Sequence, residues 1–345
     1  MQRTITLSDA LKLKKPIFVD MRAPAEYADG HIPGAVNIPL LDDDERRIVG
    51  TIYKKDGPEE AKQHGLGMVS GKLPELVSQI RDLYRSGRTV VVYCWRGGMR
   101  SKSVVSVLEL MGIPAFQLLG GYKVHRRYVL DELAAFDLRP QVVTLCGSTG
   151  VGKTTLLKLL ADRGAAVIDL EQLANHRGSA FGQVGLGRPA TAQNFDALLL
   201  IELRRLNDSP YILVECESKR IGNVYIPEVL FAAMKRGPRI LAHASLETRV
   251  ARLMEEYLAN YSADEIRDSL TTLSKRLGAA KTGKLLAAFA AGEVATVVRQ
   301  LLVDYYDPLY GYETAKDDEF AYRVDAENLS LAATAVMGYL NTLRG

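Results

Sequence analysis

The sequence predicts an α/β protein with two domains, each built on a parallel β-sheet that carries helices on its faces. Short apolar strands alternate along the chain with segments of helical periodicity, which is the pattern of a parallel sheet. Two of these strands run directly into glycine-rich turns that open a helix, one at Cys94 and the other at Gly147. The 345 residues are enough for two domains of ordinary size, and the segment 138–140 is the expected boundary between domains 1–138 and 139–345.

Composition and charge limit the possible function classes. Hydrophobic residues make up 47% of the chain and charged residues 25%, which is typical of a globular protein with sizeable cores. No apolar run reaches the roughly 18 residues of a membrane span, and the first residues lack the apolar core of a secretory signal, so we expect a cytoplasmic protein without a membrane partner. The three cysteines have no metal-ligand spacing. A net charge of +3 permits an anionic partner without requiring one.

The elements of the first domain follow from apolar runs and helical spacing. Residues 42–69 are polar and rich in turn formers, so we expect a long loop there that is functional or mobile. Asp20, Arg22, Glu26 and His31 are expected to be structural, as an internal ion pair and a loop-anchoring imidazole. The expected elements are a strand at 16–22, a short helix opened by Pro24, a strand within 30–39, a helix at 72–86, a strand at 89–93, a helix at 101–112, a strand at 116–119, and a helix that follows the tight turn at 120–121 and runs to about 135.

Cys94 is the candidate nucleophile of this domain. It ends a β-branched strand, and a turn with Gly97 and Gly98 follows before the next helix. A thiol in this place lies among backbone N–H groups and at the positive end of a helix, and both favour the thiolate. Arg96 and Arg100 add positive charge, so we expect them to act with Cys94 on an anionic compound. This description fits a phosphatase, a sulfurtransferase or a redox sensor.

The second domain opens with a phosphate-binding loop. The segment 147–154 matches the motif G-x-x-x-x-G-K-S/T in full, with an apolar strand before it and a helix after it. Its backbone N–H groups can hold a diphosphate, Lys153 supplies a point charge, and Thr154 can reach a magnesium ion. The motif does not distinguish ATP, GTP or another phosphate. The candidate phosphate-binding residues are Gly147, Thr149, Gly150, Gly152, Lys153, Thr154 and Thr155.

Further polar residues are expected to line the same phosphate site. Glu215 and Glu217 come at the carboxyl end of a strand and point the same way, a position from which carboxylates beside a phosphate loop hold magnesium or water. Cys216 between them is expected to be a buried small residue. The polar loop 175–182 supplies the candidates Asn175, His176 and Arg177, and Arg220 follows the acidic strand.

The rest of the second domain is expected to be strands and then helices. Two features allow two interpretations each. A basic run within 275–299 is either the solvated face of helices or a contact to an RNA backbone, and the tyrosines of 305–312 are either a packed corner or a platform for unpaired bases. The expected elements are strands at 141–146, 166–171, 211–218 and 239–244, a helix at 246–258, mainly helix from there to about 303, and a helix at 327–343.

Several of these motifs together resemble known families. The first set, Asp20-x-Arg22, Glu26-Tyr27, the segment 30–39 and the strand–cysteine–loop–helix at 94–101, is similar to the rhodanese family. The fusion of such a domain to a phosphate loop is a narrow combination. With the segments 120–123, 169–182 and 215–218, nearly the whole chain resembles the tRNA 2-selenouridine synthase family, most weakly after about residue 245.

The resemblance implies a specific activity. Members of this family act on 2-thiouridine at the wobble position of the tRNA anticodon loop, replace its sulfur with selenium from selenophosphate, and attach a geranyl group to that sulfur from geranyl diphosphate. It implies that residues 147–154 hold the diphosphate of the geranyl donor, with magnesium at Thr154, and that Cys94 accepts or guides selenium while Arg96 and Arg100 neutralise selenophosphate. No tightly bound cofactor is implied, and both donors are co-substrates.

Two departures keep other functions open. The spacing from Cys94 to Arg100 is one residue longer than in common single-domain rhodaneses and equals that of cysteine-dependent phosphatases, although Tyr93 stands where those usually have histidine. A wider loop would suit an anion as large as selenophosphate. The main alternative is a P-loop kinase with an accessory rhodanese domain, and it predicts nucleotide hydrolysis or transfer that depends on Lys153. A third is a regulatory module that senses anions or oxidants.

Overall fold

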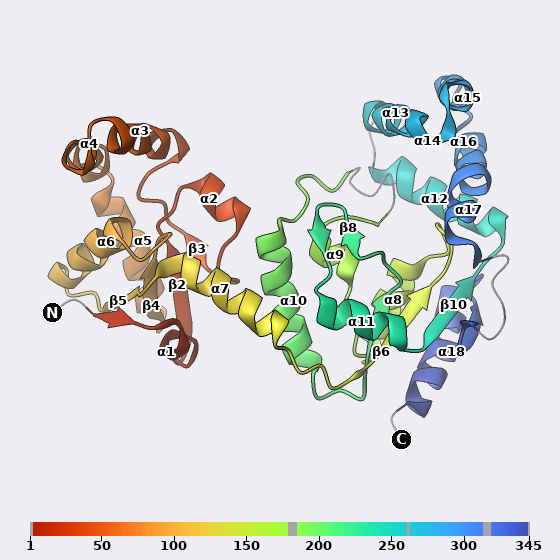
Figure 1. Ribbon diagram of the computed structural model, residues 1–345, viewed down its shortest axis with the longest axis horizontal. Helices are drawn as coiled ribbons and strands as arrows, with labels where there is room; N and C mark the ends of the chain where they lie inside the picture. The colour runs from red at the N-terminus through yellow and green to blue at the C-terminus, as the bar shows by residue number, and fades with distance from the viewer. Residues whose placement is uncertain (1–2, 179–184, 261–262, 313–318, 344–345) are drawn as a thin grey trace. The chain divides into compact units, whose positions relative to one another are not determined.

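The computed structural model describes residues 3–178, 185–260, 263–312 and 319–343. The chain forms two compact units (Figure 1). Unit 1 comprises Met1–Ala135 together with Thr191–Leu198, and unit 2 comprises Phe136–Ala190 together with Leu199–Gly345. No helix in the described part of the chain combines the length and apolar character needed to cross a membrane.

Unit 1 is built on a five-stranded sheet in which every pair of neighbouring strands is parallel. The strand order is β1-β5-β4-β2-β3, so β4 lies in the middle and its carboxyl end opens at the centre of the sheet edge. The strands are β1 (Thr4–Ile5), β2 (Pro16–Asp20), β3 (Val36–Asn37), β4 (Thr89–Tyr93) and β5 (Ala115–Leu118).

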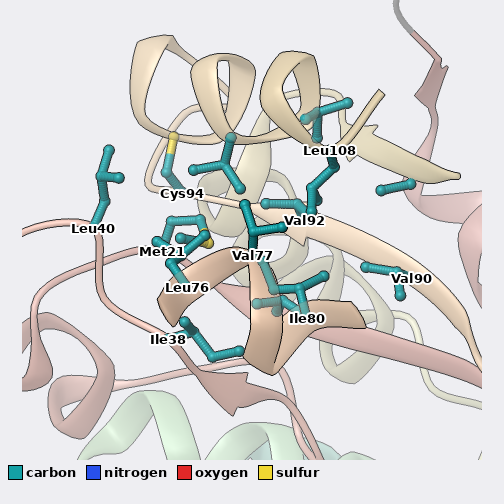
Figure 2. Packing of buried hydrophobic residues seen from close by; sticks show 14 of the residues in the cluster. Met21, Ile38, Leu40, Leu76, Val77, Ile80, Val90, Val92, Cys94 and Leu108 are labelled. Atoms are coloured by element: carbon teal, nitrogen blue, oxygen red, sulfur yellow. The ribbon is translucent and has the colours of Figure 1, made fainter. Parts of the chain in front are cut away.

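Helices cover both faces of this sheet because side chains of a strand point alternately to its two sides. Val90, Val92 and Cys94 belong to a core that includes Ile80 of α5 and Leu108 of α6 (Figure 2). Val91 and Tyr93 belong to the opposite core, with Tyr122 of α7. The helices of the unit are α1 (Leu7–Leu11), α2 (Pro24–Asp29), α3 (Asp43–Lys55), α4 (Pro58–Ser70), α5 (Leu73–Arg85), α6 (Met99–Leu110) and α7 (Gly121–Ala134).

The expected long loop at 42–69 is wrong, because this segment forms α3 and α4. Asp42 caps α3 by accepting a hydrogen bond from the Glu45 N–H, and the Glu45 side chain accepts from the Asp42 N–H in return. This capping box and the lysines in the last turn are signals of a helix. The polarity that suggested a loop reflects exposure instead, since α3 buries none of its residues.

Unit 2 contains a second parallel sheet, with the order β11-β10-β6-β7. The strand before the phosphate loop, β6, lies between β10 and β7, so the loop also emerges at the inner part of a sheet edge. The strands are β6 (Gln141–Cys146), β7 (Tyr211–Glu215), β10 (Arg239–His243) and β11 (Tyr322–Asp325), with a separate antiparallel pair of β8 (Arg220–Ile221) and β9 (Val224–Tyr225).

The helical C-terminal part that the sequence predicts is present and has a core of its own. Tyr305 and Tyr306 are buried in that core, which favours the packed-corner interpretation for these two tyrosines. The helices that follow β6 along the chain, of which α10 begins in the segment 191–198 of unit 1, are α8 (Lys153–Asp162), α9 (Leu170–Ala174), α10 (Ala192–Leu206), α11 (Glu228–Arg236), α12 (Leu246–Asn260), α13 (Ala263–Thr272), α14 (Ser274–Leu277), α15 (Ala279–Ala290), α16 (Val294–Leu301), a π-helix (Leu302–Tyr306), α17 (Asp307–Tyr310) and α18 (Leu329–Thr342).

The strand expected at 166–171 is wrong. Only Val167 makes a β-bridge, to Leu213. The chain then enters α9, because the Asp169 side chain accepts a hydrogen bond from the Gln172 N–H and caps a helix that begins at Leu170. The apolar run that suggested a strand is therefore short and is overridden by a helix cap. The fold class, α/β with parallel sheets and a helical C-terminal region, is confirmed.

Candidate functional site

The Cys94 loop lies at the carboxyl end of the central strand β4 and leads into α6. Cys94 is 3% exposed. The first turn of α7 is hydrogen-bonded to the loop. The N–H of Tyr122 donates to the Cys94 carbonyl (2.9 Å), and that of Lys123 donates to the Trp95 carbonyl (3.0 Å). Gly121 must be glycine here, because a Cβ on it would collide with the Cys94 carbonyl oxygen. The backbone of α7 thus fixes the loop's conformation.

Two side chains that the sequence analysis did not single out complete this support. The Gln117 amide donates to the Gly97 carbonyl (2.7 Å) and to the Ser101 hydroxyl (3.1 Å). The Ser101 hydroxyl lies 3.3 Å from the Cys94 sulfur. The N–H and C=O of one peptide point in opposite directions. When the loop carbonyls face Gln117 and α7, the N–H groups of the same peptides therefore face the other side of the loop, which suits the binding of an anion. The only sequence signal for Gln117 was a polar residue in an apolar strand.

The two loop arginines differ in their surroundings. Arg96 is exposed, whereas Arg100 is partly buried and donates two hydrogen bonds to Glu26, at 2.6 and 3.1 Å. Partial burial by itself would raise the pKa of Glu26, but the hydrogen bonds and charge of Arg100, with Arg46 nearby, bring this pKa below its usual value. Glu26 therefore stays charged and orients Arg100 beside the loop, a role beyond the purely structural one expected from the sequence.

The other expected structural contacts are confirmed. Arg22 and Asp20 form a fully buried ion pair at 2.6 Å, and the Arg22 guanidinium lies 4.1 Å from the centre of the Tyr122 ring. The His31 ring stacks on Tyr27 with the ring centres 3.9 Å apart, and its Nδ1 lies 3.0 Å from the Tyr27 carbonyl oxygen. These contacts link the segment 20–31 to Tyr122 in α7, the helix that supports the Cys94 loop.

The phosphate loop of unit 2 has the predicted strand–loop–helix context between β6 and α8. Arg249 and Arg252 of α12 hold its backbone, and neither was assigned a role from the sequence. The Arg249 Nε donates to the Thr149 carbonyl (2.8 Å), and an Arg252 Nη donates to the Val151 carbonyl (2.7 Å). Asp307 fixes Arg249 through a two-point ion pair at 2.5 and 3.1 Å. In the sequence, Arg249 and Arg252 are three residues apart in a predicted helix. This spacing places both on one face and was the signal that they could act together.

The side chains of the motif reach oxygen acceptors within unit 2. Lys153 donates to the Gly147 carbonyl (2.7 Å) and lies 5.7 Å from the centre of the Tyr310 ring. The Thr154 hydroxyl donates to Glu171 at 3.0 Å. The Lys153 ammonium group therefore lies at the loop, close to the place where a phosphate would bind to the loop's N–H groups.

A cluster of carboxylates faces this lysine. Glu215 is buried, one of its oxygens accepts from the Glu171 N–H (2.5 Å), and the other has no hydrogen-bond partner among the described residues. Burial raises the pKa of Glu215 well above its usual value, and the charges of Asp169 and Glu171 add to this effect. Burial also raises the pKa of Glu217 to about 8, against the opposing charge of Lys153. Positive charge placed beside these carboxyls favours their charged forms.

The polar loop after α9 packs against this cluster. The Asn175 amide is used structurally, since it donates to the carbonyls of Leu186 (2.9 Å) and Arg188 (2.8 Å). His176 Nδ1 accepts from the Gly178 N–H at 3.1 Å, and Gly178 approaches the Glu217 carboxylate closely. Arg177 is partly buried, and Arg220 is exposed with its Nε donating to Gly222. Residues 179–182 of this loop lie outside the described residues.

Cys216 is half-buried and has two polar neighbours. It directly follows Glu215, the residue of β7 that pairs with Leu145, and its N–H donates to the Leu145 carbonyl (2.8 Å). The Tyr312 hydroxyl donates to its sulfur at 3.6 Å. A hydrogen bond from the Cys146 thiol, with that of Tyr312, lowers the pKa of Cys216 to about 6 although burial opposes the shift. Cys216 was expected to be a small buried residue. It is instead partly exposed, and its sulfur accepts a hydrogen bond from Tyr312.

Comparisons with known proteins identify the family. Residues 5–127 match the model of the rhodanese-like domain, and residues 140–337 match that of the tRNA 2-selenouridine synthase AAA domain. A protein of Bdellovibrio bacteriovorus named tRNA 2-selenouridine synthase is 34% identical over 333 residues, which cover 85% of this chain and 87% of that protein. The chain belongs to the tRNA 2-selenouridine synthase family. The resemblance inferred from the motifs is therefore confirmed.

Other members of the family are similar over the same length. The Hydrogenovibrio crunogenus protein of that name is 36% identical over 337 residues, covering 89% of this chain and 92% of its own. The protein of Pseudomonas syringae pv. tomato is 35% identical over 334 residues, covering 88% and 90%. These matches extend across both the Cys94 loop and the phosphate loop, so both sites belong to the architecture that the relatives share.

Proposed function

We propose that this protein is a transferase that modifies tRNA by replacing sulfur with selenium in the wobble 2-thiouridine of the anticodon loop. The single observation that carries the proposal is the pairing, in one chain of this family, of a buried thiol in an anion-binding loop with a phosphate loop. The proposal divides the reaction between them. The phosphate loop activates the sulfur by geranylation, and the Cys94 loop supplies selenium.

In the first step the thiocarbonyl sulfur attacks C1 of geranyl diphosphate. A C–S bond forms, the C–O bond to the diphosphate breaks, and the electron pair leaves with the diphosphate. The loop N–H groups and Lys153 stabilise that leaving charge, which is the usual electrostatic contribution of such donors. Magnesium, when bound, would add positive charge there. The Thr154 hydroxyl and the Glu171 carboxylate, 3.0 Å apart, are oxygen donors of the kind that Mg²⁺ takes together with substrate phosphates and water.

In the second step selenium adds to C2 of the S-geranylated base. The C2–Se bond forms, the C2–S bond breaks and geranyl thiol leaves, while water takes up the phosphoryl group of selenophosphate to give phosphate. Arg96, Arg100 and the loop N–H groups bind the phosphoryl oxygens, and Cys94 accepts or guides the selenium. Alkylation makes this exchange feasible because a thiol leaves more readily than sulfide.

The experiment is nucleoside mass spectrometry of tRNA from a deletion strain grown with selenite and complemented with single variants. Cys94→Ser is expected to abolish 2-selenouridine while geranylated 2-thiouridine persists or accumulates. Lys153→Ala is expected to abolish both, and Lys158→Ala, an exposed lysine on the same helix α8, serves as the control that keeps both. Normal 2-selenouridine in the deletion strain would end the proposal. ATP hydrolysis that depends on Lys153, with unchanged tRNA, would favour the kinase alternative instead.

A further inference from the structure

Unit 1 contains a hollow beside the Cys94 loop for which the two reaction steps give no role. It has a volume of about 530 Å³ and lies against α3. Four cationic side chains line it, and among the described residues no acidic one does. Its lining includes Arg46, Arg47, Gly50, Tyr53, Lys54 and Arg100.

The arrangement follows from helix geometry. Positions 46 and 47, 50, and 53 and 54 are spaced by three, four and seven, so they share one face of α3. Gly50 in the middle of this face leaves room for the Arg46 guanidinium, because a Cβ at position 50 would lie 2.6 Å from an Arg46 Nη. Glycine weakens a helix interior, so its place here is explained by the space it leaves for the arginine.

The hollow is tied to the Cys94 loop through one carboxylate. Glu26 accepts from Arg100 at 2.6 Å and lies 3.5 Å from the Arg46 Nε, so a single negative charge holds two arginines. Arg47 pairs with Asp44 at 3.1 Å, but that carboxylate is 84% exposed, and such surface pairs are weak. The hollow therefore keeps an excess of positive charge and shares Arg100 with the reactive loop.

A second hollow in the same unit shows that this charge is not a general property of the surface. It is lined by Arg3, Glu109 and the partly exposed Tyr84, so its one cation is matched by one anion among the described residues. The hollow at α3 adds to its four cations a tyrosine ring that is 60% exposed. Cations that follow a backbone and an open aromatic face are the two components with which proteins bind single-stranded nucleic acid.

We propose that the hollow at α3 binds the tRNA strand next to the base that the Cys94 loop receives. Arg47 and Lys54 contact phosphates, and the Tyr53 ring stacks on a neighbouring unpaired base. Arg46 and Arg100, held by Glu26, mark the point where the strand enters the reactive site. This inference rests on the proposed function for its substrate, and it adds the surface that positions the RNA.

The test measures binding of a 2-thiouridine-containing anticodon stem-loop RNA by fluorescence anisotropy at several salt concentrations. Lys54→Ala is expected to weaken binding and to reduce the slope of log K against log salt by about 0.7–0.9, the value for one phosphate contact. Tyr53→Ala is expected to weaken binding by roughly 5- to 150-fold with little change of slope, which corresponds to the loss of one stacked base. Lys55→Ala and Tyr84→Ala are the matched controls.

The outcomes separate this inference from the proposed function. Folding is checked by thermal unfolding, which the exposed substitutions should not change. If Lys54→Ala and Tyr53→Ala bind RNA as the unchanged protein does, the inference is wrong even when selenium transfer is intact. Loss of selenophosphate or geranyl diphosphate binding with unchanged RNA binding would also overturn it, in favour of a small-anion site. An unchanged protein that does not bind the RNA at all would contradict the proposed function instead.

Discussion

At the scale of single residues, the Ser101 hydroxyl is a polar neighbour of the Cys94 sulfur. The Ser101 hydroxyl lies 3.2 Å from the Gly98 carbonyl and 3.3 Å from the Cys94 sulfur, and it accepts from Gln117. It has only one hydrogen to donate. When Cys94 is a thiolate, turning that hydrogen to the sulfur makes a charge-assisted bond, which is stronger than a neutral one. Ser101 is thus a positioning residue for the thiolate.

Replacing Ser101 by alanine should make Cys94 less reactive. A hydrogen bond to a charged group contributes roughly 1.5–3 kcal/mol, and about half of this reaches the rate because a less stabilised thiolate is also more nucleophilic, so we expect alkylation of Cys94 by iodoacetamide at pH 7 to slow roughly 4- to 15-fold in Ser101→Ala. Ser103→Ala, an exposed serine on the same helix, should alkylate at the original rate. The measurement is the rate of label incorporation at Cys94 by peptide mass spectrometry. Equal rates in all three proteins would remove Ser101 from the site.

His125 makes the stability of unit 1 sensitive to acid. It is buried against Tyr122, and its Nδ1 has no hydrogen-bond partner among the described residues. Burial, with the charge of Arg126, lowers the pKa of His125 to about 4. The unfolded imidazole, with a pKa near 6.5, binds a proton in the window where the folded one does not. Stability must therefore fall as the pH falls from about 6.5 to 4.

Substitution of His125 by phenylalanine should flatten that part of the stability profile. We expect the free energy of unfolding of the unchanged protein to drop by roughly 3 kcal/mol more than that of His125→Phe between pH 6.5 and 4. Urea unfolding at a series of pH values measures the difference. His64→Phe, at an exposed position of α4, should keep the original profile. Parallel profiles for the unchanged protein and His125→Phe would contradict a neutral buried imidazole.

At the scale of elements, the Cys94 loop and the start of α7 are one structure. The loop carbonyls are the partners of the first N–H groups of α7, groups that would otherwise lack an intrahelical acceptor. Gly121 lies at this contact with a φ of 57°, in the left-handed region. There is no room for a Cβ between Gly121 and the carbonyl oxygen of Cys94, so the start of α7 and the loop are closely packed.

Two glycine substitutions separate close packing from backbone strain. Gly112 has a φ of 70°, similar to that of Gly121, but nothing lies within 4 Å of the place where its Cβ would be. Gly112→Ala should cost only the left-handed conformation, about 1–2 kcal/mol. Gly121→Ala should cost more and should also slow alkylation of Cys94, because the loop must shift. Denaturant unfolding gives the two free energies. If the two substitutions lower the free energy of unfolding equally, the close contact at Gly121 adds no cost beyond that of the left-handed conformation.

At the scale of the whole molecule, each unit has its own sheet and its own anion-binding loop. The Cys94 loop follows β4 and the phosphate loop follows β6, and both strands lie inside their sheets, not at an edge. The carboxyl ends of inner parallel strands are where open α/β sheets bind ligands. The cores are also separate, with clusters on both faces of the first sheet and a sheet core and a helical core in unit 2.

A reaction divided between two loops should be restored by mixing. Cys94→Ser retains the phosphate loop, and Lys153→Ala retains the Cys94 loop. With tRNA, geranyl diphosphate and selenophosphate present, we expect the two variants together to form 2-selenouridine although neither does alone, since geranylated tRNA made by one can be used by the other. The measurement is nucleoside mass spectrometry. If the mixture forms no 2-selenouridine although Lys153→Ala alone converts geranylated tRNA supplied in a separate control reaction, the intermediate is not released.

The two loops and most strands could be predicted from the sequence because their signals are local. A β-branched run before glycines and a complete phosphate-loop motif specify backbone conformation within about ten residues. Local signals were misread at two segments, α3, which buries none of its residues, and α9, which is only five residues long. The capping box of α3 was present in the sequence, but its polarity favoured a loop, and the Asp169 cap overrode a short apolar run.

Only the tertiary structure decided which side chains support the loops. Gln117 lies 20 residues from the Gly97 carbonyl that it holds, and Arg249 lies 100 residues from that of Thr149. Periodicity determines which face of a strand or helix is apolar, and the sequence by itself determined that much, together with the thiol, the phosphate loop and the family. It does not specify which single polar group on a packed face meets a distant carbonyl. That depends on how neighbouring elements are placed. Ser101, Glu26 and the arginines of α12 belong to the two sites through such tertiary contacts.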